Sequence, residues 1–228
     1  RPFKALQQGG PLSGLLPAAM AADLPLEPEP FRPLGAGMGG GGLVFADDTA
    51  CVVDLNIMFS RFTEDESCGR CTTCRGGNQR MVEIFERTSR GEPEEADVDR
   101  LKALAVTMQN SNCFHGSLSP TIMNNTLAYF REEFDAHAVD LRCPAKVCAG
   151  LIRYAVANQS PAVAEAADLC PTDAIVQDAG QWRIDDRKCI RCNACKAHAG
   201  GDIEVADRFE ERIPLHTIVP ADVARAGG

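Results

Sequence analysis

The sequence has no apolar run that approaches the length of a membrane-spanning helix, which needs about 20 consecutive apolar residues. It has no cluster of lysine and arginine, and its formal net charge of −9 disfavours a nucleic-acid or anionic membrane partner. No Ser/His/Asp grouping and no pair of acids at a catalytic loop stand out, which argues against hydrolytic chemistry. The hydrophobic content of 45% excludes wholesale disorder. The chain is therefore expected to fold, and its chemistry has to come from other residues.

Cysteine is the residue that the sequence has in abundance, with 11 in 228 residues. Six of them form two Cys-x2-Cys-x2-Cys triplets, namely Cys68, Cys71 and Cys74, and then Cys189, Cys192 and Cys195. Three thiolates on one tight loop, with a fourth from elsewhere, typically hold a [4Fe–4S] cluster. Zinc sites more often use two separated Cys-x2-Cys pairs. The pattern predicts an iron–sulfur electron carrier with reduced thiolates, in the cytoplasm or on the cytoplasmic face of a membrane complex. Zinc or disulfides in the same positions are the alternative.

The second triplet has a partner in Cys170, which is followed by proline. Two-cluster bacterial ferredoxins repeat the run C-x2-C-x2-C-x3-C-P, and the fourth cysteine of each run binds the other cluster. That scheme makes a complete ligand set from Cys170, Cys189, Cys192 and Cys195. The four ligand positions of the other cluster hold Ser160, Val163, Ala166 and Ala199. The region therefore resembles a two-cluster ferredoxin that has become a one-cluster ferredoxin.

The residues at and near the vacated positions are suited to a folded module without the other cluster. Ser160 before Pro161 predicts a capped helix start, and small apolar side chains after it can fill the space of the lost cluster. Residues 174–177 and 181–184 flank Asp178-Ala179-Gly180, which predicts a β-hairpin.

The first triplet has no Cys-Pro partner nearby, and its best fourth ligand is Cys113. Apolar residues at helical spacing predict helices over 78–90 and 94–109, and two antiparallel helices would return Cys113 to the loop. A third helix is predicted after Ser119-Pro120. Its apolar stripe, interpreted as bundle core, is Met123, Leu127, Phe130 and Phe134.

Three cysteines lie outside these sets. Cys51 has apolar neighbours and is interpreted as a buried thiol rather than a ligand. Cys143 and Cys148 follow His137, and these three could supply three of four ligands to a structural zinc ion. The fourth ligand is not identifiable from the sequence, although His198 is one candidate. The alternative is a helix–turn junction with two unligated thiols.

A glycine-rich stretch over 35–42 formally contains G-x-G-x-x-G at Gly35, Gly37 and Gly40. A dinucleotide site needs a strand before this motif and a helix after it. Here proline-rich sequence precedes the motif, and the strand-like residues 43–46 follow it. We therefore expect a close-packed backbone crossing or a turn instead of a nucleotide site.

The loop Glu66–Arg75 resembles the cluster loop of the NADH-binding flavin subunit of complex I, NAD-reducing hydrogenases and NAD-dependent formate dehydrogenases. In that family the fourth ligand lies about forty residues beyond the loop, which matches Cys113. Weaker similarities are at residues 9–17, 43–45 and 127–134, so the resemblance covers about Lys4 to Cys148.

The resemblance implies that FMN and NAD bind in an N-terminal region that precedes Arg1, and not to the residues present. It also implies partner subunits, including a thioredoxin-like [2Fe–2S] subunit and a catalytic subunit such as a hydrogenase, formate dehydrogenase or quinone reductase. The expected role is one-electron transfer inside an oxidoreductase. A structural zinc scaffold and a cluster-based redox sensor remain alternatives, and the lack of a basic DNA-reading helix counts against the sensor.

The expected fold class is α+β in three units. Residues 1–50 would be the C-terminal part of a β-grasp (SLBB-like) domain, residues 51–142 a helical iron–sulfur-binding bundle, and residues 143–228 a ferredoxin-like domain with one [4Fe–4S] cluster plus a tail. Within the tail, residues 213–219 could form a terminal strand.

Overall fold

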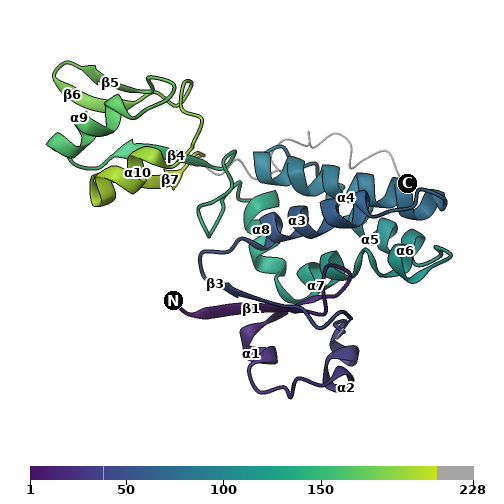
Figure 1. Cartoon of the computed structure of the whole chain (residues 1–228). Coiled ribbons are helices and arrows are strands. Elements are labelled where there is room, and N and C mark those ends of the chain that lie inside the picture. Colours follow the sequence, from purple (N-terminus) through teal and green to yellow (C-terminus); the bar gives the residue numbers. More distant parts are fainter. Residues whose placement is uncertain (38, 210–228) are drawn as a thin grey trace, which may run out of the picture.

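A computed structural model describes residues 1–37 and 39–209 of the chain, which has a mixed α/β architecture (Figure 1). Its strands are β1 (Phe3–Gln8), β2 (Leu15–Pro17), β3 (Leu43–Asp47), β4 (Ile152–Val156), β5 (Ile175–Asp178), β6 (Gln181–Ile184) and β7 (Ile203–Asp207). Its helices are α1 (Ala18–Ala21), α2 (Pro28–Phe31), α3 (Val52–Asp65), α4 (Thr72–Arg90), α5 (Asp97–Met108), α6 (Phe114–Leu118), α7 (Thr121–Tyr129), α8 (Arg131–Ala138), α9 (Pro161–Asp168) and α10 (Ala194–Ala199), with 3-10 turns η1 (Arg32–Leu34) and η2 (Gly200–Asp202).

The N-terminal sheet has the order β2-β1-β3, and both pairs are antiparallel. The glycine-rich stretch crosses the β1–β2 turn before it enters β3. Gly9 N donates to Gly42 O at 2.8 Å, and Gly40 N donates to Gly9 O at 3.2 Å. A Cβ atom on Gly39 would lie 2.1 Å from Gly9 O, so the two backbones approach more closely than a side chain would allow. The expected backbone crossing is confirmed, and a strand rather than a helix follows the motif.

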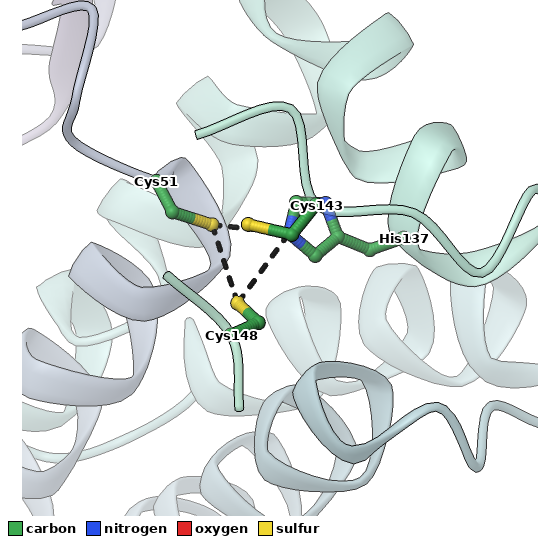
Figure 2. Close-up of side chains that lie close together, drawn as sticks. All are labelled: Cys51, His137, Cys143 and Cys148. Atoms are coloured by element: carbon green, nitrogen blue, oxygen red, sulfur yellow. Dashed lines mark hydrogen bonds between the residues drawn. The ribbon is translucent and has the colours of Figure 1, made fainter. Parts of the chain in front are cut away.

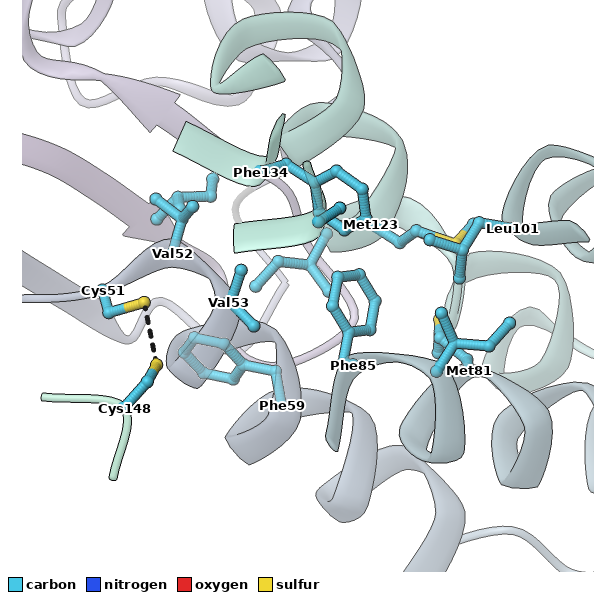
Figure 3. Close-up of a cluster of buried hydrophobic side chains, with 14 of the residues drawn as sticks. Cys51, Val52, Val53, Phe59, Met81, Phe85, Leu101, Met123, Phe134 and Cys148 are labelled. Carbon is cyan, nitrogen blue, oxygen red and sulfur yellow. Dashed lines mark hydrogen bonds between the residues drawn. The ribbon is translucent and has the colours of Figure 1, made fainter. Parts of the chain in front are cut away.

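Helices α3 to α8 form a bundle whose core is built from large apolar side chains (Figure 3). The predicted helices over 78–90 and 94–109 correspond to α4 and α5, which pack against each other. Helix α4 ends where predicted, because Gly91 adopts a left-handed conformation with φ +80°. The rings of Phe85 and Phe134 meet edge to face with centroids 6.0 Å apart.

The prediction of one helix through Met123, Leu127, Phe130 and Phe134 is wrong. The chain leaves helical geometry at Phe130, where φ is −123° and ψ is 29°, and it restarts as α8. The break lets Phe134 reach Phe85 in the core while Tyr129, at the end of α7, donates its hydroxyl to Leu34 O at 3.3 Å. Tertiary packing on two sides therefore overrides the helical period of the apolar stripe.

Residues 152–207, here called the C-terminal module, have a separate apolar core. Figure 1 shows the module beside the bundle and joined to it by the segment after α8. Strand β4 pairs antiparallel with β7, and β5 pairs antiparallel with β6. The predicted hairpin is confirmed, and Ala179 and Gly180 make its turn with φ of 48° and 79°. The β4–β7 pair was not predicted, and the expected strand over 213–219 lies outside the described residues.

No helix among residues 1–37 and 39–209 is both long enough and apolar enough to cross a membrane.

Candidate iron–sulfur and metal sites

The first triplet extends from the turn between α3 and α4 into the first turn of α4. Gly69 has φ +74°, and Cys71 and Cys74 stand at the start of α4, where Cys74 is buried. Cys113 directly precedes α6, and its segment lies against the triplet. Thr73 Oγ1 is 2.8 Å from Ser111 Oγ, and a Cβ atom on Gly116 would lie 2.9 Å from Cys74 Cβ. Helices α4 and α5 thus bring the segment that contains Cys113 back to the loop of the first triplet, as predicted from the sequence.

The second set of four cysteines lines a single cavity in the C-terminal module. Cys170 enters it from the turn before β5, Cys189 and Cys192 enter it from the loop before α10, and Cys195 enters it from the first turn of α10. The loop winds tightly, because Arg191 and Asn193 both adopt left-handed φ values of 59° and 68°.

Two contacts hold the wound loop in place. Arg191 Nε donates to Ile152 O at 3.0 Å, and Tyr154 donates its hydroxyl to Asn193 Oδ1 at 2.9 Å. Ile152 and Tyr154 both belong to β4, so this strand holds the loop in place.

The surroundings of Cys170 favour its thiolate. Burial works against the charge, but the backbone N–H groups of Thr172 and Ala174 outweigh it and lower the pKa of the Cys170 thiol. Ala174 N lies 3.3 Å from the sulfur. Burial raises the pKa of Cys195, which lines the same cavity. A bound cation would stabilise that thiolate, since only the thiolate form is a metal ligand.

Among the described residues, the group of three or more metal-ligating side chains whose ligand atoms all lie within 4.8 Å of one another lies outside both predicted cluster sets. A single tetrahedral zinc ion would hold its sulfurs ~3.8 Å apart, given Zn–S bonds of about 2.3 Å.

Three of the four positions that lack cysteine in the ferredoxin-type pattern lie in the core of the C-terminal module. Val163 and Ala166 are fully buried, and Ala199 is 7% exposed. Ser160 stands at the N-cap of α9, but its side chain makes no capping bond. Its hydroxyl instead donates to Asp202 Oδ2 at 2.6 Å. The predicted helix start is confirmed, with Ser160 at the N-cap and Pro161 at the first helical position, but the expected capping hydrogen bond is not made.

Ser160→Ala tests whether this position still binds iron. We expect the iron content per chain to stay at the wild-type value, because the serine oxygen bonds to Asp202 and its neighbours at the old site are hydrocarbon. Iron analysis of the purified variant measures it. A loss of iron in this variant would show that the position still takes part in a cluster.

A third group of side chains, which could hold a metal ion, lies where the start of α3, the end of α8 and the segment before β4 meet (Figure 2). Cys51, His137, Cys143 and Cys148 are all buried, and their ligand atoms all lie within 4.8 Å of one another. Cys51 precedes α3, His137 lies near the end of α8, and the two other cysteines belong to the segment before β4. Segments that are 86 and 97 residues apart in the sequence meet here.

The distances in this group suit a tetrahedral ion. The sulfurs of Cys51 and Cys148 are 3.6 Å apart, and His137 Nε2 lies 3.1 Å from Cys51 Sγ and 3.5 Å from Cys148 Sγ. Zinc bonds of about 2.3 Å to sulfur and about 2.0 Å to nitrogen would place S···S at ~3.8 Å and S···N at ~3.5 Å. The donor set Cys3His is one of the common structural zinc sets.

The surroundings orient the histidine for a ligand on Nε2. His137 Nδ1 lies 2.8 Å from Glu133 O, so the Nδ1–H donates to that carbonyl and Nε2 faces the sulfurs. Burial opposes the protonated imidazole, but hydrogen bonds with Cys143 and Cys51 outweigh it and raise the pKa of His137 to about 10. Hydrogen bonds with Cys148 and Cys51 lower the pKa of Cys143. These shifts favour a Cys143 thiolate beside a protonated His137 imidazole.

Two interpretations from the sequence change here. Cys51 is buried as expected, but it lies within the group and offers the fourth candidate ligand atom, which the sequence did not identify. His198 is not part of the group, because it lies in the C-terminal module with Nε2 at 3.0 Å from Glu165 Oε2. No local spacing connects Cys51 to His137, so only the fold reveals it.

Comparison with known proteins supports the first site. Residues 54–137 match the family described as the NADH-ubiquinone oxidoreductase-F iron–sulfur binding region. Over these residues the chain is similar to this family. The resemblance noted from the cluster loop is confirmed, and the matched residues include all of Cys68, Cys71, Cys74 and Cys113.

The relatives are subunits of oxidoreductases. Over 169 residues the chain is 38% identical to the NADP-reducing hydrogenase subunit HndC of Solidesulfovibrio fructosivorans, a match that covers 74% of this chain and 34% of the relative. It is 32% identical to an NADH-quinone oxidoreductase subunit of Rhizobium meliloti (strain 1021), over 63% of this chain and 34% of the relative. The chain spans about a third of the length of these relatives.

A solved structure agrees with the sequence matches. The crystal structure of an NAD+-reducing [NiFe]-hydrogenase in the H2-reduced state aligns with a TM-score of 0.50 and 30% sequence identity, over 59% of this chain and 23% of that chain. The family match ends at residue 137, so roles for the C-terminal module rest on the geometry above.

Proposed function

We propose that this chain transfers single electrons through two [4Fe–4S] clusters, as the C-terminal part of an NADH- or NADPH-dependent oxidoreductase subunit. The observation that carries the proposal is the cavity in the C-terminal module, which is lined by all four cysteines of a complete ferredoxin-type set. The family match of residues 54–137 supports the other cluster. Each cluster, when bound, accepts and releases one electron.

The ligand assignment follows from the two loops. Cys68, Cys71, Cys74 and Cys113 would hold the first cluster, and Cys170, Cys189, Cys192 and Cys195 the second. Residues 1–50 would be the end of a β-grasp (SLBB-like) domain, 51–142 the bundle of the first cluster, and 143–228 a ferredoxin-like domain with a tail. The short antiparallel pairs β4–β7 and β5–β6, each next to a helix of the module, support the last of these.

In this proposal the flavin and nucleotide sites belong to a further region of the protein. The relatives are about three times longer than the matched part, which leaves room for such a region. FMN would take a hydride from the nicotinamide and pass electrons singly to the first cluster. Partner subunits, including a thioredoxin-like [2Fe–2S] subunit and a catalytic subunit, would exchange electrons with the clusters. The metal-ligand spacing of the two cysteine triplets supports a reducing, cytoplasmic compartment.

We further propose a structural zinc ion on Cys51, His137, Cys143 and Cys148. The tetrahedral distances and the complete burial of the group support it. Such an ion would tie the start of α3 to the segment that leads into the C-terminal module, and so would limit the freedom of the module relative to the bundle.

Reductive titration tests the electron-transfer proposal. The anaerobically purified chain should be brown, should bleach with dithionite, and should take up about two electrons, one for each cluster. Electron paramagnetic resonance (EPR) should then show two reduced clusters. A colourless chain with zinc in both triplets would overturn the proposal in favour of a zinc scaffold.

A further inference from the structure

A buried asparagine lies beside one ligand of the first cluster. Asn78 follows Cys74 by one helical turn on α4 and is 0% exposed. Its Nδ2 lies 3.5 Å from Cys74 Sγ. A buried amide without a hydrogen-bond partner lowers the stability of the fold. The N–H groups of Asn78 are therefore expected to point at acceptor atoms.

Thr63 orients the amide of Asn78. The hydroxyl of Thr63 is shared between Ser60 O at 2.8 Å and Asn78 Oδ1 at 3.0 Å, and Asn78 Nδ2 lies 3.4 Å from Thr63 O. Thr63 is also fully buried. A metal-bound thiolate can only accept hydrogen bonds, so the amide turns its NH2 group to the sulfur and its oxygen to the threonine hydroxyl.

Cys74 receives a second donor from the loop. Gly69 N donates to Ser67 Oγ at 3.3 Å, and Ser67 Oγ lies 3.4 Å from Cys74 Sγ. The hydroxyl hydrogen of Ser67 is therefore free to point at the sulfur. Within the described part of the chain, no side-chain donor is recorded on Cys68, Cys71 or Cys113. Cys74 is thus the one thiolate of its set with two side-chain donors among the described residues.

We propose that Asn78 is a positioning residue that raises the reduction potential of the first cluster through its N–H···S bond to Cys74. The inference rests on the proposed function. One-electron reduction adds one negative charge that is shared with the ligand sulfurs, and an N–H dipole aimed at a sulfur stabilises that charge. The site is buried, which strengthens the dipole. Asn78 keeps its hydrogens in both states, so no proton moves with the electron.

Asn78→Leu removes the donor at similar volume. We expect the ratio of reduced to oxidised first cluster at a fixed potential to fall about tenfold, which is about 59 mV for one electron. The potentials of both clusters are measured in the same sample by EPR during a titration with dithionite. The second cluster is the internal reference, and its potential should not change.

Asn56→Leu is the matched control. Asn56 is also 0% exposed and on a bundle helix, but its Nδ2 donates to Val52 O and Thr126 Oγ1, both at 2.7 Å. The same substitution there should leave both potentials at their wild-type values. A fall in the first potential in this control would show that the shift reports loosened packing and would overturn the proposal.

Thr63→Val keeps Asn78 but removes the hydroxyl that orients it, so the first potential should fall in the same direction. Thr63→Ser keeps the hydroxyl and should restore the wild-type potential. If Asn78→Leu does not assemble the first cluster, this pair decides, and equal potentials in the two variants would overturn the inference. An unchanged potential in Asn78→Leu with an assembled cluster would also overturn it, while the proposed function would stand. A wild-type chain without any EPR signal from the first cluster would instead overturn the proposed function.

Discussion

Cys189→Ala should abolish the second cluster and leave the first intact. The iron content should fall from about eight to about four per chain, because a cubane needs four ligands and the variant offers three. The first cluster should survive, because its ligands lie in the bundle, which has its own core. Iron and sulfide analysis together with EPR of the dithionite-reduced variant measures both clusters.

The reciprocal variant is the control for this experiment. Cys71→Ala should remove the first EPR signal and retain the second. The two variants should therefore lose complementary signals. Loss of both signals in either variant would contradict the assignment of separate ligand sets, and so would retention of all iron in Cys189→Ala.

Cys51→Ser should remove zinc without loss of iron. The zinc content should fall from about one per chain to near zero after dialysis against a chelator, because the tetrahedral Cys3His set loses one thiolate. The variant should also unfold at a lower denaturant concentration, since the ion ties residue 51 to the segment 137–148. Elemental analysis gives the zinc content, and circular dichroism during denaturation gives the stability.

His198→Ala is the control for the zinc experiment. His198 bonds to Glu165 in the C-terminal module and offers no atom to the buried group. Its substitution should leave zinc at the wild-type level. Zinc retained in Cys51→Ser, or lost in His198→Ala, would contradict the proposed ligand set.

Local patterns in the sequence predict the elements that local physics determines. The apolar period of α4 and the glycine at its end specify that helix, and the turn residues at Ala179 and Gly180 specify the hairpin. The glycine-rich stretch likewise predicts a close backbone crossing, because only glycine permits the approach of Gly39 to Gly9.

The elements that the sequence does not predict depend on contacts between distant residues. The helix break at Phe130 comes from packing on two sides, and the β4–β7 pair joins residues about 50 positions apart. The same limit applies to the metal group. His137, Cys143 and Cys148 are close in sequence and can be proposed as ligands, but Cys51 reaches them only through the packing of α3 against α8.

Quantitation of iron, acid-labile sulfide and zinc in anaerobically purified chain tests the central claim most directly. Two complete sets of four thiolates predict about eight irons and about eight sulfides per chain at full occupancy. About twelve irons would mean that the chain binds a third cluster through other ligands, since Val163, Ala166 and Ala199 offer no ligand atom. About four irons would mean that one of the two cysteine sets does not bind a cluster, and either result would contradict the account.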